Sequence, residues 1–386
     1  MPDTIYLIGI SVTFFLAVLL IGEKNKSRSN HILTLWLVAI GVHLTAYYVF
    51  SSGAYLSFPY YLGFELPLPF LHGPFLYLYT CSLTDPPGRQ AKPWLHFIPF
   101  LANYIVLFPF LTLPVADKVY VYQHKGEGYT HITGVMSIAI MISGVTYVVL
   151  SLLKLKRYKK FIEDRFSDTE KINLAWLRYL ILGISVIWVF VILGTDPLVY
   201  AAATLFVLFI GYFGIKQVGI LARTPVYGTQ EETDDPEEQG PDSDDTPPPD
   251  NAPLSEKYKY EKSGLKDEQI TALHRQLTAM MREEKAYKNP EVTLLDLARQ
   301  LDIHPNYLSQ VINSVEQKNF YDFINEHRVE EFKQIVTLPG NQHYTLLTLA
   351  FECGFNSKTS FNRNFKKATG MTPSSYLDRL NIHLEE

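Results

Sequence analysis

Seven apolar stretches of membrane-spanning length lie within the first 219 residues of this 386-residue chain. A helix that crosses a bilayer needs roughly 20 mostly apolar residues, and its backbone polar groups must be satisfied within the helix itself. The chain is therefore expected to be all-α, with a seven-helix transmembrane bundle in residues 1–222. The seven stretches are Thr4–Ile21, His31–Phe50, Leu62–Leu83, Trp94–Pro114, His131–Leu153, Asn173–Gly194 and Leu198–Gly219.

The loops between these stretches differ strongly in their content of basic residues. Loops after the first, third and fifth stretches carry twelve Lys and Arg residues, whereas the loops on the other side carry only Lys118 and Lys125. Because basic loops stay in the cytoplasm, the amino terminus is predicted outside and the carboxyl terminus inside. The first stretch precedes its basic residues, unlike a cleavable signal. We therefore expect a multi-pass protein of the inner (cytoplasmic) membrane.

A different composition follows the apolar half. Gly228–Glu256 contains eleven acidic residues, no basic residue, and six prolines between Pro236 and Pro253. Such a segment cannot bury enough apolar surface to offset the entropy lost on ordering. Residues 223–262 are therefore predicted to be an acidic, Pro-rich, disordered linker.

Residues 263–386 show the apolar periodicity of two similar helical hairpins. Thr293–Asn313 and Leu346–Lys367 each predict a helix, a short turn and a second helix. Between them, Asn319–Thr337 predicts a helix about 28 Å long at 1.5 Å per residue. A further helix is expected to begin at Leu265, with Ser263 as its cap.

The second hairpin has the sharper pattern. Gly354 suits the left-handed turn that ends a helix, Phe355 is expected in the core, and Ser357 is placed to cap the next helix. Phe361 and Phe365 define the buried side of that helix. Its other side is a polar and basic stripe formed by Lys358, Thr359, Asn362, Arg363 and Lys366.

These residues carry a family resemblance. Phe320–Val329 with Arg328, followed by A-x3-GF-x-S-x-x-x-F-x-R-x-FKK-x-x-G-x-TP from Ala350 to Pro373, resembles the AraC/XylS family of transcription regulators. The resemblance covers Ser263–Arg379. The architecture also resembles membrane-tethered members of Bacteroidetes type with several amino-terminal spans. In the first hairpin Asp302 stands where the second has Gly354, so the first is expected to read bases less stringently.

The resemblance implies that the exposed faces of both recognition helices reach base edges. Arg and Lys donate to guanine acceptors, and Asn and Gln pair with adenine, while further lysines hold phosphates. From Cys353 to Leu380 there are five basic residues and one acidic residue. The predicted base-reading residues are Asn306, Ser309, Gln310, Lys358, Thr359, Asn362 and Arg363, and the predicted phosphate contacts are Lys366 and Lys367.

The apolar half has one unusual stretch, Phe64–Tyr79, which contains three prolines. Glu65 and His72 lie seven residues apart, on one face of a helix, and His43 falls in the middle of another stretch. Intramembrane ionisable residues are costly and often functional. His43, Glu65 and His72 are therefore a candidate sensor pocket; the alternative places Glu65 at the interface and lets His72 bond a neighbouring helix.

Two functions are compatible with these features. The first is a membrane-bound one-component transcription regulator, whose expected partners are double-stranded DNA, the lipid bilayer and an unknown small-molecule or envelope signal; a homodimer is left open. The alternative is a membrane transporter or receptor with a regulatory cytoplasmic tail. No catalytic motif and no metal-ligand spacing is present, so we expect no enzyme activity and no cofactor. The acidic linker is expected to be a tether, or else to compete with DNA for the basic stripe.

Overall fold

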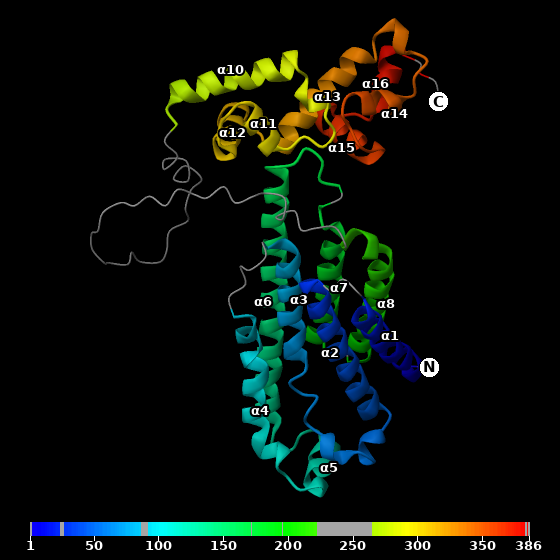
Figure 1. Cartoon of the computed structure of the whole chain (residues 1–386). Helices are drawn as coiled ribbons and strands as arrows, with labels where there is room; N and C mark the ends of the chain where they lie inside the picture. The colour runs from blue at the N-terminus through cyan, green and yellow to red at the C-terminus, as the bar shows by residue number, and fades with distance from the viewer. Residues whose placement is uncertain are drawn as a thin grey trace, which may run out of the picture. The chain divides into compact units, whose positions relative to one another are not determined.

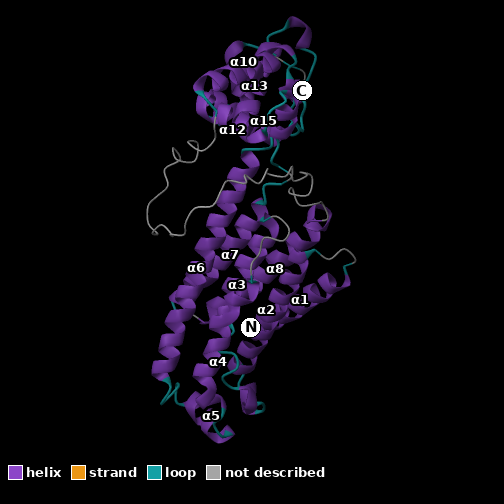
Figure 2. Cartoon of the chain, turned by 60° about the vertical axis from the view of Figure 1, so that its left-hand side comes forward, coloured by secondary structure: helices purple, strands orange, loops and turns teal. Residues whose placement is uncertain are grey.

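The computed structural model describes residues 2–23, 27–85, 92–170, 172–194, 196–221, 265–382 and 384. These residues form helices, turns and one isolated antiparallel bridge, with no strand among them (Figures 1 and 2). The all-α prediction is confirmed. Contacts divide the chain into two units, residues 1–158 with 174–231, and residues 159–173 with 232–386. The predicted linker, 223–262, lies outside the described residues.

The first unit contains the apolar helices. Six helices among the described residues are long and apolar enough to cross a membrane. One of the six is Pro93–Leu111, in which a 3₁₀ turn leads into α4; α3, with 16 residues, is shorter than all six spans. A short helix not expected from the sequence, α5, lies between α4 and α6. The helices are α1 Pro2–Gly22, α2 Arg28–Ser51, α3 Pro69–Thr84, α4 Ile98–Leu111, α5 Val115–Gln123, α6 Thr130–Glu163, α7 Ala175–Ile192 and α8 Asp196–Leu221.

α3 begins at Pro69, seven residues later than the predicted start at Leu62. Gly63 has a φ of +96°, and the chain up to Leu68 runs through turns. Proline lacks the N–H that an inner helical position donates, but it is tolerated in the first turn. Pro67 and Pro69 therefore delay the helix, and the residues before them fold back as turns.

The outward side chains of the first unit are strongly apolar. Phe15, Ile105, Val135 and Leu205 are each at least 60% exposed. Apolar surface on this scale is unusual for a protein in water. Small residues permit close helix crossings inside the unit: a Cβ on Gly144 would lie 2.2 Å from the Trp188 ring. This packing is typical of helices in a bilayer.

The second unit contains both predicted hairpins. α11 and α12 form the first, α14 and α15 form the second, and α13 joins them. α10 begins at Asp267 instead of Leu265, and Ser263 lies outside the described residues. The helices are α10 Asp267–Glu283, α11 Leu294–Gln300, α12 Pro305–Val311, α13 Phe320–Ile335, α14 Leu346–Glu352, α15 Lys358–Thr369 and α16 Pro373–Leu380, with a π-helical turn Ile312–Glu316 after α12.

Side-chain caps set the starts of these helices. Thr293 Oγ1 accepts from the Asp296 N–H at 3.2 Å, and the Asp296 carboxylate accepts from the Thr293 N–H at 2.9 Å. Ser357 caps α15 as predicted, accepting from the Ser360 N–H at 3.0 Å. Such caps satisfy N–H groups that have no partner within the helix. Hydroxyl side chains therefore fix the starts of α11, α14, α15 and α16, while His304 and Asn319 cap α12 and α13.

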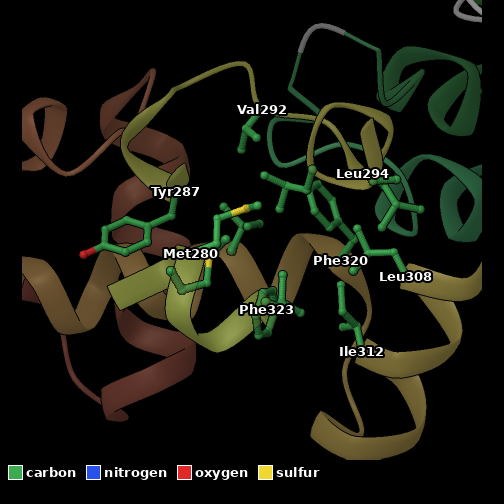
Figure 3. Close-up of a cluster of buried hydrophobic side chains, with 13 residues drawn as sticks. Met280, Tyr287, Val292, Leu294, Leu308, Ile312, Phe320 and Phe323 are labelled. Carbon is green, nitrogen blue, oxygen red and sulfur yellow. The ribbon is translucent and has the colours of Figure 1, made fainter. Parts of the chain in front are cut away.

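Two hydrophobic clusters form the core of this unit, and α13 contributes to both. Its first half places Phe320 and Phe323 against α10, α11 and α12; Figure 3 shows Phe320 beside Leu294 and Leu308. Its second half places Val329 and Phe332 against α14 and α15. Because one rigid helix is buried in both clusters, α13 fixes the two hairpins relative to each other.

Candidate nucleic-acid interface and bundle cavity

α15 separates its buried and exposed residues cleanly. Phe361 and Phe365 are fully buried, as the spacing of apolar residues in the sequence predicted. The other side of the helix is exposed, and we call it the α15 face. This positioning agrees with the predicted stripe, and the face is made of Lys358, Thr359, Asn362, Arg363, Lys366 and Lys367.

Arg363 is held in place by a tyrosine from α13. Its Nη2 donates to the Tyr321 hydroxyl at 2.6 Å, and its Cζ lies 5.7 Å from the Tyr321 ring centroid. The same hydroxyl accepts from Asn364 Nδ2 at 2.7 Å. Sequence reasoning missed Tyr321, because nothing in its local pattern shows that α13 and α15 pack together. The contact orients a guanidinium before any ligand arrives.

Lys367 already has a carboxylate partner. Its ammonium lies 2.7 Å from Asp322 on α13, and the lysine side chain is 64% exposed. An exposed pair of this kind contributes little to stability. A phosphate would therefore compete with Asp322 for Lys367.

The α12 surface agrees only partly with the sequence prediction. Asn306 is exposed, and Ser309 is half-buried with its Oγ accepting from Asn313 Nδ2 at 3.2 Å. Gln310 is only 7% exposed, so the prediction that it faces outward is wrong. The helical period places it opposite Leu308, but burial depends on what packs over a helix, which the period does not encode. Tyr307, 39% exposed and overlooked in the sequence, lies on the accessible surface instead.

Arg328 on α13 is a buried polar residue beside the turn that precedes α11, and it is 1% exposed. Its Nε donates to the Tyr287 carbonyl at 2.8 Å, and its Nη2 donates to the Asn289 carbonyl at 2.8 Å. Nη1 donates to Asn325 Oδ1 at 3.2 Å. Burial lowers the pKa of Arg328 to about 10, which still leaves it charged at neutral pH. These bonds satisfy the buried cation, as its burial requires.

Glu331, one turn along α13, holds the η5 turn Ala286–Lys288. Its carboxylate accepts from Lys285 at 2.9 Å, from Lys288 at 2.7 Å and from the Tyr287 hydroxyl at 2.9 Å. Burial alone would raise the pKa of Glu331, but the bonds from Lys288, Lys285 and Tyr287 outweigh it and lower the pKa to about 2. The carboxylate is therefore ionised at neutral pH and ties the η5 turn, which precedes the first hairpin, to α13.

Residues 297–379 match the sequence model of a helix-turn-helix domain family. The match supports a DNA-binding transcription regulator of the AraC type. The matched segment begins within α11 and ends in α16, so it covers the first hairpin from Leu297 onward, the whole second hairpin and the helix between them. No curated protein and no solved structure matches the chain.

The apolar helices line a partly open cavity of about 330 Å³. His43 on α2, His72 on α3 and Tyr200 on α8 place polar atoms in its lining. His43 Nδ1 lies 2.9 Å from His72 Nε2, and the Tyr200 hydroxyl lies 3.1 Å from His43 Nε2. The three side chains thus form a hydrogen-bonded row in a wall that is otherwise largely apolar, with Trp36, Ile140 and Trp188 among its residues.

Glu65 does not join the two histidines. It precedes α3, so it does not share a helical face with His72 as predicted. Its carboxylate accepts from the Tyr122 hydroxyl of α5 and from the Gly63 N–H at 3.0 Å. The delayed start of α3 explains the difference, since the seven-residue spacing applies only within a continuous helix. Of the candidate sensor pocket, the structure brings together His43 and His72 only.

Proposed function

We propose that the protein is a membrane-bound one-component transcription regulator that binds DNA sequence-specifically through two helix-turn-helix motifs. The observation that carries the proposal is α13, which is buried in both hairpin cores and holds two recognition helices in one rigid unit. A chain of this kind that also has six span-length apolar helices among its described residues would keep its DNA-binding part at a bilayer.

The geometry supports a two-site contact with DNA. α13 has 16 residues and is therefore about 24 Å long, and the hairpins at its two ends extend the reach further. Recognition helices about 34 Å apart can enter successive major-groove faces. In this proposal base edges are read from α15 by Lys358, Thr359, Asn362 and Arg363. From α12 they are read by Asn306 and Ser309. Lys366 and Lys367 hold phosphates.

The membrane part supports an orientation with the amino terminus outside and residues 263–386 in the cytoplasm. The basic residues counted above lie in loops that this orientation places inside. Residues 223–262 would then link the bundle to the DNA-binding part. The arrangement lets a signal reach a DNA-binding domain without a second protein.

The bundle cavity is the proposed signal site. Its apolar wall fits a small, mostly apolar molecule, and the row formed by His43, His72 and Tyr200 fits one hydrogen-bonding group on that molecule. Ligand sites commonly combine an apolar wall with a few convergent polar groups. The cavity is lined by α2, α3, α6, α7 and α8, so its occupant would contact most of the bundle.

Mapping of the DNA bound by the full chain in cells tests the proposal. We expect discrete sites that share one motif, recovered together with the membrane fraction. A His72→Phe variant should keep the motif and lose the response of the regulated genes to the signal. Bound DNA without a shared motif, or a protein recovered only in the soluble fraction, would contradict the proposal.

A further inference from the structure

The segment Asp164–Glu170 joins α6 to α7 in the chain, yet it packs within the second unit. We call it the docking segment. The Arg165 carbonyl accepts from the Leu294 N–H at 2.9 Å, at the start of α11. Phe166 forms the isolated antiparallel bridge with Thr293. The segment is therefore held by backbone hydrogen bonds to the first hairpin.

Ser167 is the buried centre of this contact and is 1% exposed. Its Oγ donates to the Val292 carbonyl at 2.7 Å and accepts from Arg328 Nη2 at 3.2 Å. Its carbonyl accepts from Asn325 Nδ2 at 3.0 Å. The docking segment thus shares the polar network by which Arg328 connects α13 to the Tyr287–Pro290 turn before α11.

Two carboxylates of the docking segment lie at the amino-terminal end of α15. Asp168 Oδ2 accepts from Asn356 Nδ2 at 2.9 Å, and Glu170 Oε2 accepts from the Ser357 hydroxyl at 2.5 Å. Ser357 is also the cap of α15. The amino end of a helix favours a negative charge, and for the same reason it binds phosphate. Asp168 and Glu170 therefore occupy a place suited to a DNA phosphate.

We propose that the docking segment is an internal competitor of DNA for the amino end of α15. The docked state and the DNA-bound state exclude each other there, because a phosphate and two carboxylates repel at close range. The inference rests on the proposed DNA-binding function. The segment directly follows α6 and precedes α7 by four residues, and both helices line the cavity. Displacement of those helices by a ligand would withdraw the carboxylates and free α15.

The first test neutralises the carboxylates in the full chain, held in lipid nanodiscs. Binding is measured by fluorescence anisotropy with a fluorescein-labelled duplex that the parent protein selected from a random pool. Asp168→Asn with Glu170→Gln should tighten binding roughly 3–10-fold, because charge-assisted bonds become weaker neutral ones. Glu163→Gln is the matched control: it removes a carboxylate from the end of α6, where Glu163 pairs with Lys159 at 3.5 Å. It should leave the affinity unchanged.

The second test traps the docked state. One chain carries both Asp168→Cys and Asn356→Cys, and a short bis-methanethiosulfonate links the two new thiols. A reducing agent releases the link. The native Cys81 and Cys353 are buried. Linked protein should bind the selected duplex at least about tenfold more weakly, with recovery on reduction. The two single variants, treated alike, cannot be cross-linked and should bind the duplex at least as tightly as the parent.

The outcomes separate the docking inference from the proposed function. Equal or weaker binding by the neutralised variant, failure of the cysteines to link, or full affinity of the linked protein would overturn the inference and leave DNA binding intact. A parent protein that selects no motif from the pool would instead overturn the proposed function.

Discussion

The guanidinium of Arg363 on α15 donates to the hydroxyl of Tyr321 on α13 at 2.6 Å. α13 is the helix shared by both hydrophobic clusters. The orientation of a predicted base-reading residue is therefore set by the element that also fixes the spacing of the two hairpins. A side chain fixed in this way loses less entropy on binding than a free arginine.

This contact gives a prediction about readout. Arg363→Ala should relax the base preference at one operator position and weaken binding by roughly 1–3 kcal/mol. Tyr321→Phe keeps the ring but removes the hydroxyl that holds Arg363. It should therefore cause a smaller loss of base preference at that same operator position. Binding-site selection with each variant measures both effects. An unchanged motif for Arg363→Ala would show that Arg363 reads no base.

The ion pair between Lys367 and Asp322 gives a second prediction, about affinity without sequence preference. Asp322→Asn should strengthen binding to every duplex roughly 2–5-fold at low salt, since the carboxylate no longer competes with phosphate. Lys367→Ala should weaken binding to every duplex by the same factor. It should also reduce the slope of log affinity against log salt concentration by about one. Titrations over a salt series with two unrelated duplexes check both. A change confined to one duplex would argue against a phosphate contact.

The sequence predicted the local features of the hairpins well. Ser357 as a cap, Phe361 and Phe365 as the buried side of α15, and a left-handed Gly354 all follow from short-range chemistry. Asp302, predicted at the matching turn of the first hairpin, also has a positive φ of 54°. These features depend on residues within a few positions of each other, where periodicity and capping rules apply.

The contacts between distant segments could not be predicted in this way. Nothing near Ser167 indicates that it would be buried beside Arg328, 161 residues away. The burial of Gln310 and the separation of Glu65 from His72 likewise depend on packing and on where α3 begins. Sequence periodicity reports which side of a helix is apolar, but it does not report what covers the other side.

The carboxylate of Glu331 gives a third prediction, about pH. Its pKa is lowered to about 2 in the folded protein, below the ordinary value of about 4.3. A depressed pKa contributes stability above the unfolded value, and that stability is lost as the pH falls through the folded value. The second unit should therefore lose on the order of 2–3 kcal/mol between about pH 5 and pH 2.

Hydrogen exchange of α13 amides in the full chain measures this loss. Glu331→Gln should lower protection at pH 6 and flatten its dependence below pH 5. Glu330→Gln is the matched control, because Glu330 is an exposed neighbour whose bond to Lys333 at 2.9 Å lies on the surface of the same helix. Parallel pH profiles for the parent and the Glu331 variant would rule out the assigned role.

The fourth prediction concerns Gly354, where the second hairpin meets the η5 turn. Its φ is +95°, and a Cβ there would lie 2.6 Å from the Tyr287 carbonyl oxygen and 2.9 Å from that of Lys288. Both oxygens are backbone atoms and cannot swing away. Gly354→Ala should therefore combine left-handed strain with a steric clash and destabilise the second unit by roughly 2–4 kcal/mol.

Two other glycines separate these causes. Gly370 has a φ of +78° with open space around it, so Gly370→Ala should show the strain alone, about 1 kcal/mol. Gly340 has neither feature, so Gly340→Ala should be nearly neutral. Pulse proteolysis in urea measures the stability of each of the three variants and so ranks them. Because the clash at Gly354 pushes apart the turn that Arg328 holds, its variant should also lose DNA affinity, whereas Gly340→Ala should not. Equal stability of the Gly354 and Gly370 variants would show that the turn can move and that the close approach is not required.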